Sequence, residues 1–393
     1  MAATAFPVLW LCGPPGVGKT TVAWELYSQL GREGVASGFV DVDQLGICYP
    51  EMVTDPGRHR LKARNVAAMV DGFRAAGAAC LIVAGVVDPG FGVHTEEIPR
   101  AAVTVCRLRA DADVLRRRFT GRGGPAGSVD DVLREAAALD AADVTDTCVD
   151  TTGLPVTEVA RLVGERTGGW PGTVRPANAP VPSAVPGQPG AGAPVLWLCG
   201  ATGVGKSTVG FEVYRRILST GTTAAYLDLD QLGFYRPAPA GDPGNHRVKA
   251  RNLAAVWRTY RAAGATCLVM TGPAEDTSTV EAYADALPGA DLTLCRLHAG
   301  PEHLTERIMS RRHGGSWPQP GDPLRGQPAA RLHRVADRAA AAAAAMEGTG
   351  IGDLRIDTDG RSVEGVADAI NTAWAERRYA RPGPAHADRR RER

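Results

Sequence analysis

Short apolar runs alternate with longer segments of helical periodicity along the first half of the chain. Apolar runs of strand length without polar alternation indicate strands buried on both faces of a sheet. The expected strands are residues 8–12, 36–42, 80–84, 103–108 and 147–150, and the expected helices are residues 19–30, 58–76, 112–119, 129–142 and 155–165. This alternation predicts an α/β fold, a parallel sheet with helices on both faces and ligands at the carboxyl ends of its strands.

The second half of the chain repeats the first. The segment V-L-W-L-C-G at residues 8–13 recurs at residues 195–200, at an offset of 187 residues. The same offset relates H-R-L-K-A-R-N at residues 59–65 to H-R-V-K-A-R-N at residues 246–252. A repeat with the period of a whole domain predicts two tandem domains of one fold. The expected boundaries are residues 1–167 and 194–378 for the two domains, 168–193 for a linker rich in Pro, Gly and Ala, and 379–393 for a basic, disordered tail.

Each half carries a glycine-rich loop between its first expected strand and its first expected helix. The loops read G-P-P-G-V-G-K-T at residues 13–20 and G-A-T-G-V-G-K-S at residues 200–207. Backbone N–H groups of such a turn converge on an anion, and the helix N-terminus adds a favourable dipole. The loops therefore predict two P-loop sites for nucleoside triphosphate phosphates with Mg²⁺. The expected cofactor-binding residues are Gly13, Gly16, Val17, Gly18, Lys19, Thr20 and Thr21, and Gly200, Gly203, Val204, Gly205, Lys206, Ser207 and Thr208.

Lysine is rare in this chain and falls at repeated positions. Of 44 lysine and arginine residues only four are lysines, namely Lys19, Lys62, Lys206 and Lys249. A compact ammonium is not interchangeable with a planar guanidinium, so these positions favour a functional requirement. Slow divergence from a duplicated ancestor explains Lys62 and Lys249 equally well.

Two aspartates end the second expected strand of each half, Asp41 with Asp43 and Asp228 with Asp230. Side chains two residues apart on a strand point to the same side, so both carboxylates are expected to face the phosphates. One carboxylate would accept a proton from a substrate hydroxyl while the other orients Mg²⁺ through water. Helix capping or a solvated loop edge is the structural alternative.

A further metal-orienting carboxylate is expected after the third strand of each half. Asp88 and Glu275 occupy matching positions there. The expected metal ligands are therefore Thr20, Asp43 and Asp88, with Ser207, Asp230 and Glu275.

Arginines recur at helical spacing in both halves. Arg60 and Arg64, like Arg247 and Arg251, are four residues apart and share a helix face. Such a face can clamp an anionic or hydroxylated acceptor through bidentate bonds, although a surface ion-pair face would give the same pattern.

A later helix of each half carries a second arginine pair, Arg118 with Arg122 and Arg307 with Arg311, followed by a Gly-Gly dipeptide. Arginines before such a hinge could close over the triphosphate and stabilise charge in the transition state. Solvated arginines on an amphipathic helix are the alternative.

Composition restricts the expected partners and location. A net charge of +1 and 6% aromatic residues argue against a nucleic-acid surface, and the apolar runs are too short to span a membrane. The eight cysteines show no C-x-x-C spacing, so neither zinc nor disulfides are implied. We expect a cytoplasmic protein with a small-molecule partner. The sequence indicates no protein partner.

These motifs resemble the small-molecule kinases of the P-loop NTPase superfamily, which act on nucleotides, gluconate, shikimate, adenylyl sulfate and antibiotics. The resemblance rests on the P-loop at residues 13–20, Asp41 and Asp43, the arginines at 118 and 122, and the turn D-T-T-G at residues 150–153. It implies a five-stranded parallel sheet of order 2-3-1-4-5 in each half, with that turn near the adenine. Asp88 and Glu275 depart from the family pattern, because no strongly apolar run ends directly at either residue.

The sequence thus predicts two ATP- and Mg²⁺-dependent kinase-like domains that transfer a phosphoryl group to a small hydroxyl or acid acceptor. Asp43 and Asp230 are the preferred bases. ATP is favoured over GTP because no lysine follows an asparagine, as the guanine motif N-K-x-D requires. An obvious AAA+ sensor-arginine arrangement is also missing from the sequence. The alternative function is an ATP-binding regulatory or scaffold ATPase without small-molecule kinase activity.

Overall fold

A computed structural model describes residues 5–121, 126–142, 145, 147–172, 192–274, 276–313 and 322–380. The strands and helices expected from the apolar pattern of the first half are confirmed. The first half contains β1 (Phe6–Cys12), α1 (Lys19–Arg32), β2 (Ser37–Asp41), β3 (Cys48–Tyr49), α2 (His59–Ala75), β4 (Cys80–Ala84), β5 (Ala101–Arg109), α3 (Ala112–Thr120), α4 (Val129–Ala141), β6 (Cys148–Asp150) and α5 (Val156–Arg166). The second half contains β7 (Pro194–Cys199), α6 (Lys206–Ser219), β8 (Ala224–Asp228), β9 (Tyr235–Arg236), α7 (His246–Ala262), β10 (Cys267–Thr271), α8 (Thr277–Asp285), β11 (Asp291–His298), α9 (Pro301–Ser310), α10 (Ala329–Thr349), β12 (Leu354–Asp357) and α11 (Val363–Ala380).

Two six-stranded sheets form the centre of the molecule, in the orders β6-β5-β1-β4-β2-β9 and β12-β11-β7-β10-β8-β3. The five strands that each half contributes to its own sheet run parallel. The sixth strand comes from the other half and runs antiparallel. The expectation of a five-stranded, wholly parallel sheet is therefore wrong at one edge of each sheet.

The exchange of edge strands is reciprocal. In the first sheet Gly38 lies opposite Tyr235, and the Phe39 N–H donates to the Phe234 carbonyl at 2.8 Å. In the second sheet Ala225 lies opposite Cys48, where the Tyr226 N–H makes the equivalent bond at 2.9 Å. Each exchanged strand has only two residues, too few to show any alternation of apolar and polar positions. The sequence pattern could not predict these strands for that reason.

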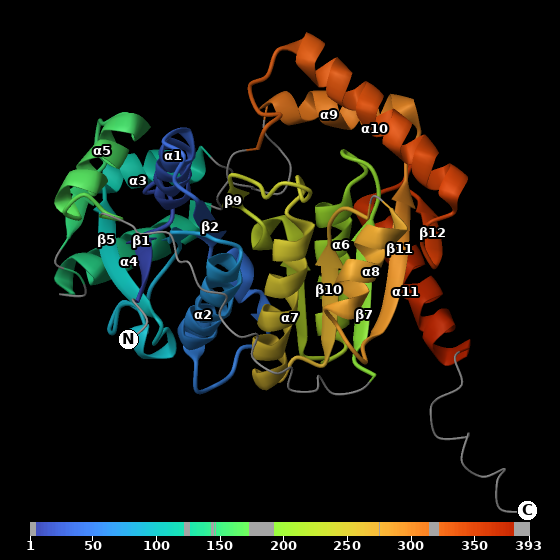
Figure 1. Cartoon of the computed structure of the whole chain (residues 1–393), viewed down its shortest axis with the longest axis horizontal. Coiled ribbons are helices and arrows are strands. Elements are labelled where there is room, and N and C mark those ends of the chain that lie inside the picture. Colours follow the sequence, from blue (N-terminus) through green and yellow to red (C-terminus); the bar gives the residue numbers. More distant parts are fainter. Residues whose placement is uncertain are drawn as a thin grey trace, which may run out of the picture.

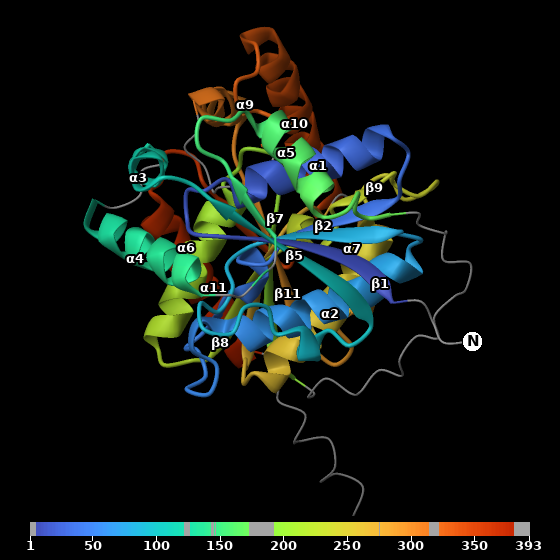
Figure 2. The same cartoon turned by 90° about the vertical axis from the view of Figure 1, so that its left-hand side faces the viewer.

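Helices cover both faces of each sheet, and one core crosses between the halves. In the first half α1 and α5 lie on one face and α2 on the other (Figure 2). At the centre of the molecule α2 lies beside α7 (Figure 1). A single apolar cluster includes Met69 and Phe73 of α2 with Trp257 and Tyr260 of α7. The two halves therefore share buried apolar surface as well as strands.

Aromatic side chains stabilise the exchanged edge. The Phe234 ring lies 5.1 Å from the Trp24 ring and 5.7 Å from the Phe39 ring, both in edge-on geometry. The Arg236 guanidinium lies 4.8 Å from the centre of the Tyr27 ring. Edge-on ring pairs and cation–π contacts both add to the gain from burial.

No helix within the described ranges is long and apolar enough to cross a membrane. Most of the predicted linker, residues 173–191, and most of the predicted tail, residues 381–393, lie outside those ranges. The domain boundaries stay predictions.

Replacing Phe234 with alanine should destabilise the whole chain, since this ring of one half packs into the other half. We expect a loss of about 2–4 kcal/mol in the free energy of unfolding, as for other large-to-small changes at packed sites. Urea denaturation would measure the loss. Val53→Ala is the control, because Val53 is 98% exposed and should change stability by less than about 0.5 kcal/mol. An unchanged midpoint for Phe234→Ala would contradict a stabilising role for the exchanged edge.

Candidate active sites

Each P-loop follows the central strand of its sheet and opens a helix. In the first half the loop joins β1 to α1, and Gly13, Gly16 and Gly18 have φ angles of 140°, 88° and 104°. These angles favour glycine. A Cβ atom on Gly13 would lie 2.3 Å from the Leu108 carbonyl oxygen, and one on Gly200 would lie 2.5 Å from that of Leu297. The backbone path of both loops therefore requires glycine at the first position.

The P-loop lysines lie folded over their own loops. The Lys19 ammonium donates to the carbonyls of Gly13 at 2.7 Å and Pro14 at 3.1 Å. The Lys206 ammonium donates to the carbonyls of Gly200 at 2.9 Å and Ala201 at 3.0 Å. Burial lowers the pKa of both lysines, and the nearby aspartates oppose this effect. The N-cap residues Gly18 and Gly205 have no side chain to cap the first N–H groups of α1 and α6. These N–H groups and the lysine suit a phosphate anion.

The remaining predicted P-loop residues follow the same arrangement. Val17 and Val204 are buried, while Thr21 and Thr208 lie exposed in the first helical turn.

The aspartate pairs connect to the P-loop hydroxyl groups. Thr20 Oγ1 donates to Asp41 Oδ2 at 3.1 Å, and Ser207 Oγ donates to Asp228 Oδ2 at 2.9 Å. The other carboxylate oxygen of Asp41 accepts the N–H of Asp43 at 3.2 Å, and the equivalent bond from Asp230 is 3.0 Å. The first aspartate of each pair thus joins the P-loop to the turn that carries the second.

The two carboxylates of each pair differ in electrostatic state. Burial and the neighbouring Asp43 raise the pKa of Asp41 to about 6, and burial with Asp230 does the same for Asp228. Burial alone would also raise the pKa of Asp43, but the positive charges of Lys62 and Lys19 hold it below its usual value. Asp43 exposes 38% of its side chain, whereas Asp41 is buried. The second carboxylate is therefore ionised and accessible.

A lysine from α2 or α7 holds the second carboxylate of each pair. Lys62 Nζ lies 3.0 Å from Asp43 Oδ1, and Lys249 Nζ lies 2.7 Å from Asp230 Oδ1. A Cβ atom on Gly46 would approach the Lys62 side chain to 2.6 Å, so this glycine leaves room for the lysine stem. Both repeated lysine positions thus contribute to the sites, either at the P-loop or at the aspartates.

Arg118 and Arg307 lie beneath the P-loops. Arg118 donates to the Val17 carbonyl at 3.2 Å and to the Thr151 hydroxyl and carbonyl at 3.0 and 3.1 Å. Arg307 makes the equivalent bonds to Val204 and Thr358. Each guanidinium therefore ties a P-loop to the turn after the last strand. Their predicted role in the transition state stays a prediction, and Arg122 lies outside the described residues.

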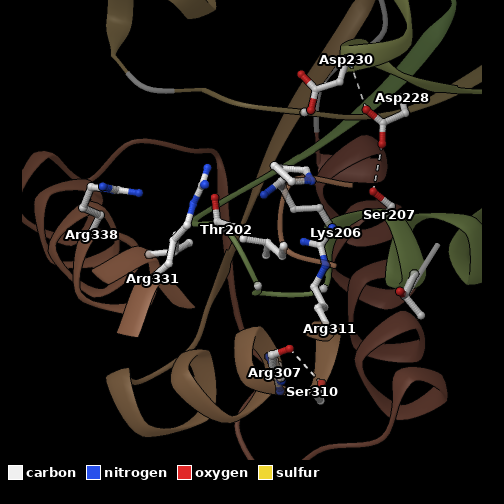
Figure 3. Close-up of a pocket in the computed structure, with 17 residues that line it drawn as sticks. Thr202, Lys206, Ser207, Asp228, Asp230, Arg307, Ser310, Arg311, Arg331 and Arg338 are labelled. Carbon is white, nitrogen blue, oxygen red and sulfur yellow. Dashed lines mark hydrogen bonds between the residues drawn. The ribbon is translucent and has the colours of Figure 1, made fainter. Parts of the chain in front are cut away.

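A cavity of about 550 Å³ lies over the second P-loop (Figure 3). Arg311 lines this cavity near Lys206 and forms an ion pair with Asp322 at 3.1 Å. Two arginines of α10, Arg331 and Arg338, also line it, and sequence reasoning missed both. Their spacing of seven residues on one helix face was the available signal. Several positive groups thus surround this candidate phosphate site.

The predicted acceptor arginines differ between the halves. In the first half Arg60 lies 3.1 Å from Glu96, and Arg64 makes two bonds of 2.9 Å to Glu97. In the second half Arg247 and Arg251 are exposed and form no ion pair within the described ranges. The first pair thus forms the ion-pair face weighed from the sequence, and acceptor binding by either pair stays a prediction.

Asp88 lies away from the P-loop contacts. Its side chain accepts the Gly90 N–H at 2.8 Å and lies 3.8 Å from His94 Nε2, and no contact with Thr20, Asp41 or Asp43 occurs among the described residues. Glu275 is outside the described part of the chain. Neither predicted metal role is supported by a contact.

Within the described ranges no group of three or more His, Cys, Asp or Glu side chains could hold a metal ion. Mg²⁺ usually binds through one or two protein groups, substrate phosphates and several waters. The hydroxyl and carboxylate oxygens of Thr20 with Asp41, and of Ser207 with Asp228, are hard donors of the kind that such an ion requires.

Asp41→Asn should stabilise the free protein at pH 8. The pKa of Asp41 in the folded chain, about 6, exceeds its usual value of 3.8, so its charge destabilises the fold above pH 6 and this cost disappears as the pH falls toward 4. We expect a gain of about 1–3 kcal/mol at pH 8 that shrinks with falling pH.

Asp43→Asn is the matched control and should have the opposite sign. The lowered pKa of Asp43 means that its charge stabilises the fold at neutral pH, and this contribution is lost on acidification. Thermal unfolding at pH 8 and pH 4.5 measures both variants. Equal shifts in both would exclude the assigned difference between the carboxylates.

Comparisons with known proteins agree with these motifs. Residues 9–138 match the model of a family described as an AAA domain, although the sequence shows no obvious AAA+ sensor-arginine arrangement. A search of curated proteins finds no match. The family match confirms the resemblance to the P-loop NTPase superfamily over residues 9–138.

Solved structures of small-molecule kinases are among the similar proteins. A gluconokinase from Sinorhizobium meliloti is 16% identical, covers 48% of this chain and 97% of its own, and has a TM-score of 0.31. A tunicamycin resistance protein from Deinococcus radiodurans is 20% identical, with coverages of 46% and 95% and a TM-score of 0.31. A shikimate kinase from Acinetobacter baumannii is 14% identical, with coverages of 47% and 94% and a TM-score of 0.31. Each is similar to about half of this chain.

Proposed function

We propose that the chain is an ATP- and Mg²⁺-dependent phosphotransferase that acts on a small hydroxyl or acid acceptor, with one site in each half. One observation carries the proposal. In both halves a chain of contacts runs from the P-loop hydroxyl through two aspartates to a lysine of the next helix. This chain joins a phosphate-binding loop to an accessible carboxylate, as phosphoryl transfer to a second molecule requires.

The two aspartates of each pair have different proposed roles. Mg²⁺ would neutralise charge on the phosphate oxygens. Thr20 and Asp41 would hold it in the first half, and Ser207 and Asp228 in the second, because these oxygens already share hydrogen bonds. The metal role predicted for Asp43 and Asp230 has less support, since both contact lysines.

Asp43 and Asp230 are the proposed bases that accept the acceptor proton. They are the more exposed members of their pairs, at 38% and 46% of the side chain. Lys62 and Lys249 orient them and keep them ionised. A base must be unprotonated and within reach of the proton it removes.

We also propose that the chain forms two tandem domains with the boundaries given above. We propose further that it binds ATP in preference to GTP and that it is located in the cytoplasm.

Lys19→Ala and Lys206→Ala should each remove one nucleotide site. The wild-type chain should bind two equivalents of ATP with Mg²⁺ in isothermal titration calorimetry, and each variant one, because the ammonium group is needed at the outer phosphates. The double variant should bind none. Two sites that persist in either single variant would refute the assignment.

Acceptor-stimulated ATP consumption should depend on the proposed bases. A screen of hydroxylated metabolites with the wild-type chain should find turnover that falls at least about 100-fold in the double variant Asp43→Asn/Asp230→Asn, as expected for loss of a general base. ATP binding by that variant serves as the control and should persist. Intact ATP binding without acceptor-stimulated turnover in the wild-type chain would favour the regulatory alternative.

A further inference from the structure

Helix α7 contacts both candidate sites. Near its N-terminus Lys249 pairs with Asp230 of the second site at 2.7 Å. Near its C-terminus the Tyr260 hydroxyl donates to the Leu45 carbonyl of the first half at 2.6 Å. Leu45 lies in a 3-10 turn, Gln44–Gly46, that follows Asp43 directly. A residue of the second half thus holds the turn that directly follows the first-site carboxylates.

The Leu45 carbonyl receives two buried hydrogen bonds. Besides Tyr260, the Asn65 side-chain amide of α2 donates to it at 2.6 Å. Asn65 is in turn held from the second half, because the Thr259 hydroxyl donates to its side-chain oxygen. Leu45, Asn65 and Tyr260 are all fully buried. Both donors to this carbonyl therefore depend on α7.

The second site lacks this support. The residue equivalent to Tyr260 is Phe73, which has no hydroxyl, and the residue equivalent to Thr259 is Gly72. The carbonyl equivalent to that of Leu45 is on Leu232, which accepts the Asn252 amide at 2.7 Å and no second side-chain donor among the described residues. The side-chain oxygen of Asn252 is buried, also with no hydrogen-bond partner in the described part of the chain. The bond from Tyr260 is thus a feature of the first site, added to an arrangement that both sites share.

We infer that Tyr260 is a positioning residue for the first site, so that this site is built from both halves of the chain. Its hydroxyl fixes the turn at residues 44–46 and thereby keeps Asp41 beside Thr20 and Asp43 beside Lys62. The inference rests on the proposed function of those carboxylates. Without the hydroxyl, the Leu45 carbonyl keeps one of its two hydrogen bonds, the one from Asn65, and the carboxylates gain freedom relative to the P-loop. The bonds that hold Lys19 on the P-loop go to the Gly13 and Pro14 carbonyls and do not involve Tyr260.

Tyr260→Phe tests the inference with little risk to folding, because phenylalanine occupies the equivalent position in the first half. Measured in a Lys206→Ala background, nucleotide binding reports the first site alone. Calorimetry should show affinity for ATP with Mg²⁺ reduced about three- to tenfold, the effect of one lost buried hydrogen bond. Affinity for ATP in excess EDTA should be unchanged, because the P-loop contacts remain. A purely structural role would lower both affinities alike or neither.

Two controls separate position from stability. Tyr235→Phe removes another bond between the halves, from the Tyr235 hydroxyl to the Ala76 carbonyl at 2.9 Å, at the far end of α2 from the carboxylates. It should leave both affinities of the first site unchanged. Tyr260→Phe in a Lys19→Ala background should leave binding by the second site unchanged.

Amide hydrogen exchange provides a readout that does not depend on a ligand. The segment 44–49 should exchange faster in Tyr260→Phe than in the wild-type chain, since its turn has lost one anchor.

The outcomes distinguish this inference from the function on which it rests. If the Lys206→Ala parent binds no nucleotide, the proposed function fails and the inference with it. If the parent binds ATP with Mg²⁺, and Tyr260→Phe binds it equally well or loses ATP affinity equally in EDTA, the inference alone is overturned.

Discussion

An edge strand with unpaired N–H and C=O groups must be covered, and in this protein each half covers the edge of the other. The strands β3 and β9 are two residues long, yet each pairs with the edge of the other half's sheet, and α2 contacts α7 in the same interface. The apolar cluster around Phe73 and Trp257 then continues from one half into the other. The position of the carboxylate turns follows from this arrangement, because each turn lies just before the strand that its half gives away.

Charge balance around the P-loops depends on the same geometry. Each site holds two lysines and two aspartates close together, apart from any charge that a nucleotide would add. Buried charges remain stable only when they are paired and hydrogen-bonded. The lysine of α2 or α7 is the partner that allows the second aspartate to stay ionised. Binding at the phosphate loop and the state of the second aspartate are therefore linked through shared neighbours.

The regular elements and the P-loops could be predicted because they have strong local signals. Apolar runs such as residues 80–84 have the length and composition of buried strands, and the glycines of the P-loop follow from its backbone angles. The exchanged strands have no such signal. Contacts such as Tyr260 with Leu45 depend on residues 215 positions apart, and only the packing of two helices brings them together. The contact of Asp88 with His94 depends likewise on the course of the loop after β4, for which the sequence has no local signal.

Exchange within one chain also changes how the pairing depends on protein concentration. Two residues per strand supply too few hydrogen bonds to hold separate molecules together at low concentration. When both partners belong to one polypeptide, association is intramolecular, and the effective concentration of a tethered partner can be on the order of millimolar. Dilution therefore does not weaken the contact. A first site that needs Tyr260 from the other half remains complete in a single molecule at any concentration of the protein.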